Sequence, residues 1–130
     1  MKNAYGFGKT VPVSFADAIT RVTSALQKEG FGVLSDIDVA ATLKKRLDRD
    51  LPPYRILGAC NPPLASRALE ADPSIGLLLP CNVVVRADAA GTVHVEFMDP
   101  YAVLQLVDKP EVEALAREVR ERLDRVMAAV

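Results

Sequence analysis

The chain has 130 residues, half of them apolar and a quarter charged, a composition typical of one globular domain with its own core. Its formal net charge of -1 gives no electrostatic reason to bind nucleic acid or an anionic membrane, and the absence of tryptophan argues against a base-stacking surface. The sequence contains neither an apolar signal segment near its start nor an apolar run of about 20 residues that could span a membrane. We therefore expect a single domain over residues 1–130, located in the cytoplasm, where its two cysteines would be free thiols.

The first quarter of the chain predicts a strand, a helix and a second strand. Residues 4–13 contain aromatic residues separated by glycines, which indicates a strand, here expected at a sheet edge. Ser14 is a good N-cap for the helix that follows, and Gly30 would end that helix. The apolar residues after Gly30 then indicate a second strand that closes at Asp36.

A second helix, a third strand and a third helix are expected next. Asp38 can cap the second helix, and the proline pair at 52–53 would stop it. Residues 54–60 have the pattern of a strand. Asn61 can then cap a third helix that has Pro62 at its first position, where a missing N–H costs nothing.

The middle of the chain predicts a hairpin. After a helix end at 72–73, residues 77–87 form a long apolar segment, which predicts a strand interrupted by Pro80. Ala90 and Gly91 favour a turn, and residues 92–98 alternate between apolar and polar side chains, as in a half-buried antiparallel strand.

The end of the chain predicts one long helix. Residues 101–107 are compatible with a loop, a short strand or a helical turn, and Asp108 is the expected cap of the final helix. That helix has an apolar stripe and an opposite, charged face that we expect to be solvated. The resulting order β-α-β-α-β-α-β-β-α predicts an α+β fold with two layers, a mostly antiparallel sheet with helices on one face.

Two similar segments contain both cysteines of the chain, Cys60-Asn61-Pro62 and Pro80-Cys81-Asn82. Cys60 lies beside a predicted helix N-terminus, whose partial positive charge can lower the pKa of a thiol. The alternative is that Cys60 is a small buried residue of the core. Cys81 shares its strand face with Val83 and Val85, which favours burial. The two thiols could form a redox pair only if their strand ends are adjacent.

Three other polar residues, His94, Asn82 and Asp99, could take part in a site. His94, the only histidine, falls on the polar face of its strand, away from Cys81, so neither a metal centre nor a Cys–His nucleophile is expected. Asn82 is unusual inside a strand, and either orients a loop or binds a polar ligand. Asp99, before Pro100, ends the hairpin and could lie near the cysteine segments, although turn chemistry explains it as well.

Several segments are distinctive when taken together: Gly30-Phe31, Asp36-Ile37-Asp38, Gly58-Ala59-Cys60-Asn61-Pro62 and Leu78-Leu79-Pro80-Cys81-Asn82-Val83-Val84-Val85. With them the chain resembles the bacterial domain-of-unknown-function family 302, from about Tyr5 to Val126. The resemblance implies a small α+β fold, similar in outline to single-repeat TBP-like domains, and self-association into dimers. It implies no catalytic residue, because the family has no established activity.

The sequence thus predicts a ligand-binding or interaction domain that self-associates, with a polar site at the loops of Cys60, Asn61, Cys81 and Asn82, and with Asp99 as a further candidate. A small-molecule ligand is compatible with this site, and no cofactor, metal, nucleic acid or membrane is expected. The alternative is a thiol-dependent redox or metal-handling protein that uses Cys60 and Cys81. An enzyme is less favoured, because no nucleophile, base and oxyanion site come together in the sequence.

Overall fold

A computed structural model describes all residues from 1 to 130. One sheet of five strands runs through the molecule, and every neighbouring pair is antiparallel. The order of the strands across the sheet is β1-β5-β4-β3-β2, so the two strands nearest the N-terminus form the two edges. The strands are β1 (Gly6–Val11), β2 (Gly32–Asp38), β3 (Tyr54–Cys60), β4 (Cys81–Ala87) and β5 (Val93–Met98).

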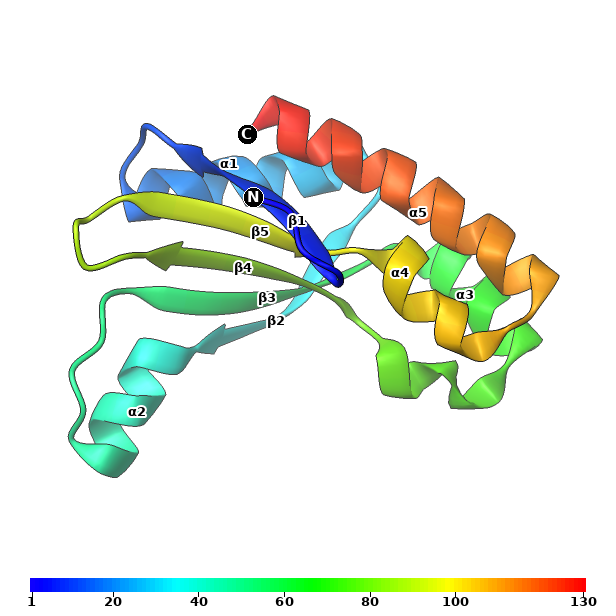
Figure 1. Ribbon diagram of the computed structural model, residues 1–130, viewed down its shortest axis with the longest axis horizontal. Coiled ribbons are helices and arrows are strands. Elements are labelled where there is room, and N and C mark those ends of the chain that lie inside the picture. The colour runs from blue at the N-terminus through cyan, green and yellow to red at the C-terminus, as the bar shows by residue number, and fades with distance from the viewer.

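Five α-helices and two short 3₁₀ segments connect these strands. The helices are α1 (Phe15–Lys28), α2 (Val39–Leu47), α3 (Pro62–Ala71), α4 (Pro100–Leu104) and α5 (Pro110–Ala129), with 3₁₀ segments at Pro73–Leu78 and Gln105–Val107. Figure 1 shows α1 and α5 on one face of the sheet and α3 and α4 gathered at one end of it. The expected α+β fold with an antiparallel sheet is therefore confirmed. No helix combines the length and apolar character needed to cross a membrane.

The core lies between the sheet and the pair α1 and α5. Alternate residues of the central strands point into it, including Val83, Val85 and Phe97, as the apolar–polar alternation predicts. The Phe97 ring stacks on Phe7 of the edge strand β1, with 5.4 Å between the ring centroids. The predicted stripe of α5 completes the core, with Leu115, Val119, Leu123 and Val126 buried among others.

Polar side chains begin most helices where the sequence predicts. The hydroxyl of Ser14 accepts from the Asp17 N–H, and the carboxylate of Asp38 accepts from the Ala41 N–H. The expected cap at Asp108 is wrong. Asp108 adopts a left-handed backbone conformation with a φ of 54°, and Lys109 is the residue before α5, without a side-chain cap.

Two further expectations about the elements need correction, and one segment that the sequence left open is now defined. The strand predicted over 77–87 begins only at Cys81, because Leu77 and Leu78 belong to a 3₁₀ segment, and Pro80 therefore precedes the strand instead of interrupting it. Residues 101–107, left open by the sequence, are helical in α4 and the second 3₁₀ segment. Finally, α2 does not pack its apolar side on the sheet: no residue of α2 is buried, and the helix extends away past β2 (Figure 1).

Candidate functional site

An apolar pocket lies at the end of the sheet where β3 leaves it and β4 enters it. Its volume is about 410 Å³. Strand ends, α3, α4 and α5 all contribute to its wall, and no charged residue lines it. The lining residues are Phe31, Leu34, Ser35, Ala59, Cys60, Asn61, Leu64, Ala65, Ala68, Leu69, Leu79, Pro80, Cys81, Leu104, Leu115 and Val119. Three residues singled out from the sequence, Cys60, Asn61 and Cys81, thus meet at one pocket.

Cys81 is buried at the first position of β4. Its strand partner is Ala59, and its side chain faces the core together with Val83, as the alternation predicts. Burial raises the pKa of the Cys81 thiol to about 11, and the charge of the neighbouring Cys60 adds to the increase. Because the thiolate is the nucleophilic form, Cys81 is a poor nucleophile at neutral pH.

Cys60 is the last residue of β3 and is half-buried. It follows Ala59, the residue directly across from Cys81, so the ends of the two cysteine-bearing strands are adjacent, which the sequence permitted but did not require. The two cysteines form no disulfide.

Asn61 is buried and joins α3 to the end of α1. Its side-chain oxygen accepts from the Leu64 N–H at 3.3 Å, and its side-chain nitrogen donates to the carbonyl of Glu29 at 3.4 Å. Arg122 of α5 donates to the same carbonyl at 2.9 Å. Gly30 lies against this cluster with a φ of 84°, and a Cβ at this position would come within 2.9 Å of the Asn61 side-chain nitrogen. The amide of Asn61 therefore joins α3 to the end of α1, and Arg122 connects α5 to the same carbonyl behind the pocket.

The N-terminus of α3 has no free N–H group for a ligand. Pro62 and Pro63 occupy its first two positions and have no N–H. The N–H of Leu64 donates to the side chain of Asn61, and that of Ala65 donates to the Asn61 carbonyl. An anion such as phosphate, which binds helix N-termini through free N–H groups, finds no donor here.

Asn82 and Asp99 lie outside this pocket. Asn82 is exposed on the sheet face opposite the helices, because it follows the inward-facing Cys81 in the strand. Asp99 caps α4 by accepting from the Tyr101 and Ala102 N–H groups, and it forms an ion pair of 2.6 Å with Arg120 of α5. Neither residue therefore lines the pocket that the two cysteines share, and Asp99 has a structural contact instead.

His94 also lies away from the cysteines. It is on the face opposite the core and contacts Asp88 across the hairpin turn at 2.9 Å. No group of three or more His, Cys, Asp or Glu side chains in the structure is arranged to hold a metal ion. Cys60 and Cys81 thus have no third ligand from this chain.

Comparison with known proteins identifies the family. The model of "Domain of unknown function DUF302" matches residues 7–130. The chain belongs to this family. A crystal structure of an uncharacterized conserved DUF302 protein from Bacillus stearothermophilus matches with a TM-score of 0.88 and 27% identity, covering 95% of this chain and 96% of that one. Curated proteins gave no match.

Family membership names no site, so the pocket is defined by its geometry alone. Sequence reasoning missed most of its apolar wall, including Phe31, Leu104 and Leu115, because a side chain that lines a cavity has the same pattern as one that fills a core. It also missed Arg122, whose Nε is buried without a partner beside the Glu29 carbonyl that Asn61 contacts. One signal for Arg122 was available in the sequence, because this arginine directly precedes Leu123 of the apolar stripe.

Proposed function

We propose that this chain is a binding domain for a small, neutral and largely apolar molecule, held in the pocket between β3, β4, α3 and α5. The observation that carries the proposal is the pocket itself. Its volume of about 410 Å³ lies in the range of roughly 300–1,000 Å³ that is typical of small-molecule sites. Most of its lining is hydrophobic, with 13 such residues among 16.

The polar groups of the pocket limit the ligand to a neutral one. The Ser35 hydroxyl and the Cys60 thiol lie at its wall, while one donor and one acceptor of the Asn61 amide are already engaged. Without a lining cation and without free N–H groups at α3, a carboxylate or phosphate would lose its hydration with no partner in return. A ligand with an apolar body and one hydroxyl or carbonyl group matches these contacts.

Binding can be tested with the neutral dye Nile red, using 1-decanol as the competitor. We expect saturable binding at one site that decanol displaces. Ala65→Leu, which places a larger side chain in the pocket, should weaken binding at least about tenfold. Ser66→Leu adds a leucine at the next, exposed position of α3, outside the pocket, and should leave binding unchanged. Absence of saturable binding, or equal loss in both variants, would refute the proposal.

An intrinsic reporter is available because the chain contains no tryptophan. Leu69 lies at the pocket and is partly exposed, so Leu69→Trp introduces a single indole at its wall. We expect decanol to shift the emission of this indole to the blue as water leaves the pocket. An unchanged spectrum at saturating decanol would argue against occupancy.

Thiol chemistry is the second candidate function, supported by the two cysteines at one pocket. In this reaction diamide would oxidise Cys60 and Cys81 to a disulfide and take up both hydrogens. The raised pKa of Cys81 weakens this candidate. An intact chain that keeps two titratable thiols after diamide treatment would exclude the redox reaction. Metal handling by the two cysteines would need further ligands from a second molecule.

We also infer that the chain self-associates into a dimer and acts in the cytoplasm, where reduced cysteines are maintained. Neither inference depends on the ligand. Equilibrium sedimentation of the pure chain tests the first, and the distribution of a tagged chain between cell fractions tests the second.

A further inference from the structure

Two thiols line the apolar pocket, and they differ in what can reach them. Cys81 is only 6% exposed and lies on the core side of the cavity, whereas Cys60 is half-buried at its wall. A molecule that enters the pocket from solvent therefore meets the sulfur of Cys60. Because a cysteine sulfur is intrinsically very nucleophilic, this residue gives the pocket a reactive atom as well as a shape.

The hydroxyl of Ser35 lies next to Cys60 on the same side of the sheet. Ser35 pairs with Gly58 across β2 and β3, and Gly58 and Cys60 are two residues apart, on one face of β3. The space that a Cβ of Gly58 would fill is occupied by the Ser35 hydroxyl and the Pro80 ring. This hydroxyl forms no hydrogen bond within the chain.

The separation of these two groups suits one small reactive molecule. Two residues along a strand span roughly 7 Å. The conjugated C=C–C=O group of an enone or enal can bridge such a distance, with its β-carbon in contact with a thiol and its carbonyl oxygen accepting from a hydroxyl. The pocket therefore combines an apolar wall, a nucleophilic sulfur and a free hydroxyl donor.

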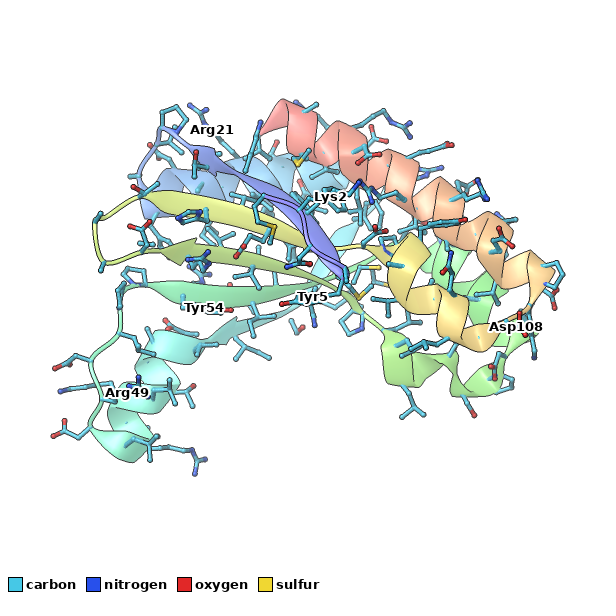
Figure 2. The ribbon with its side chains drawn as sticks, in the orientation of Figure 1. Lys2, Tyr5, Arg21, Arg49, Tyr54 and Asp108 are labelled. Carbon is cyan, nitrogen blue, oxygen red and sulfur yellow. The ribbon has the colours of Figure 1, made fainter.

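The pocket lacks the groups that other cysteine reactions require. No charged residue lines it, and the basic side chains of α2 lie at the opposite end of the molecule from α3 and α4, as Arg49 shows in Figure 2. The α3 N-terminus has no free N–H group, so the oxyanion of an acyl transfer would have no backbone donor. Exchange with Cys81 would use a thiol whose pKa is raised by burial. Addition to a conjugated double bond needs none of these groups.

We propose that the pocket captures apolar α,β-unsaturated ketones and aldehydes by conjugate addition of Cys60. The apolar part of the molecule lies against the hydrophobic wall, and its carbonyl oxygen accepts from the Ser35 hydroxyl. This inference rests on the proposed small-molecule binding and names the class of the ligand.

The addition is balanced without any further reactant. The thiol of Cys60 releases its proton, its sulfur bonds to the β-carbon, and the electron pair of the C=C bond moves to give an enolate. The α-carbon of the enolate then takes up one proton from water, which replaces the proton that the thiol released. No group leaves and nothing is oxidised or reduced. The hydroxyl of Ser35 stabilises the negative oxygen of the enolate.

Two enones with the same reactive group and different tails test the proposal. The double bond of trans-3-nonen-2-one carries a pentyl group, and that of trans-3-penten-2-one carries a methyl group. Each rate with the full chain is divided by the rate of the same enone with glutathione, a thiol without a pocket. We expect this ratio to be at least about tenfold higher for the longer enone, because the pocket holds its tail beside the sulfur.

The position of the adduct and competition for the pocket provide two further measurements on the wild-type chain. Peptide mass spectrometry should place the adduct of the longer enone on Cys60. Saturating 1-decanol, which occupies the same apolar wall, should slow the longer enone and leave the shorter one nearly unaffected. Equal ratios for the two enones, or adducts that lie chiefly on Cys81 or on lysines, would overturn the proposal.

Matched variants separate the tail contact from the hydroxyl contact. Ala65→Leu should lower the ratio of the longer enone to that of the shorter one, and Ser66→Leu, outside the pocket, should not. Ser35→Ala should slow both enones at least about tenfold. Iodoacetamide, whose reaction displaces iodide and forms no enolate, should still alkylate Cys60 of Ser35→Ala at the wild-type rate. An equal loss with iodoacetamide would refute the role of the hydroxyl.

The failure of this inference differs from the failure of the binding function. Nile red binding that decanol displaces, together with equal ratios for the two enones, would overturn the capture and leave the binding function standing. Absence of both Nile red binding and tail dependence would overturn both. Circular dichroism checks the fold of each variant, and the decanol competition tests the tail contact in the wild-type chain if Ala65→Leu unfolds.

Discussion

The two cysteine–asparagine segments have the same two residues in the same order, yet they occupy opposite environments. Cys60 ends a strand, so Asn61 leaves the sheet and becomes a buried helix cap. Cys81 begins a strand, so Asn82 remains in the sheet and points to its exposed face. The position of a dipeptide within its element, more than its composition, therefore determines whether a side chain can reach a site.

The largest expected difference between the two segments is in thiol reactivity. Cys60 is half-buried, whereas Cys81 is buried and burial raises the pKa of its thiol to about 11. At pH 8 the folded chain should therefore react with iodoacetamide at Cys60 about a hundredfold faster than at Cys81. Peptide mass spectrometry after timed labelling measures both rates. Equal rates in the folded chain, with equal labelling in denaturant as the reference, would contradict the difference in burial.

The second difference concerns stability at alkaline pH. An unfolded thiol loses its proton near its ordinary pKa of 9.0, while the folded chain keeps the Cys81 proton up to about pH 11. The stabilisation is therefore complete below pH 9 and is lost progressively as the pH rises to about 11, by up to about 3 kcal/mol. Urea unfolding from pH 8 to 11 should show this loss relative to Cys81→Ala. The prediction fails if both chains have the same pH dependence.

The smallest difference lies between the asparagines. Asn61→Ala removes the cap of α3 and a hydrogen bond to Glu29, and should lower the free energy of unfolding by about 1–2 kcal/mol. Asn82→Ala, at an exposed position, should change it by less than about 0.5 kcal/mol. Urea denaturation of the two variants measures both values, and a larger loss at Asn82 would show that this side chain has a partner.

Local signals predicted most of the fold. The caps at Ser14, Asp38 and Asn61 are short-range hydrogen bonds, and residue identity is enough to anticipate them. The alternation of residues 92–98 likewise follows from one side of the strand facing the core. Asp108 shows the limit of such signals, since an aspartate suits a left-handed turn as well as a cap.

The positions of α2 and of the pocket could not be predicted in this way. The apolar residues of α2 recur at helical spacing and form one face of the helix. This spacing does not indicate whether the face packs against the same chain or against another molecule. The volume of the pocket depends on the distance between the core and the chain segment that joins α3 to β4. Gly58 is one example: a Cβ there would meet the Ser35 hydroxyl and the Pro80 ring, a contact between three separate segments.

The proline pair at the start of α3 also gives the pocket a built-in spectroscopic reporter. Because Pro62 and Pro63 have no amide hydrogen, the first turn of this helix contributes only the Leu64 and Ala65 amides to hydrogen exchange. Both donate to Asn61, so each can exchange only when the cap beside the pocket opens. The exchange rates of these two amides therefore measure how often this end of the pocket opens, and how far a bound molecule keeps it closed.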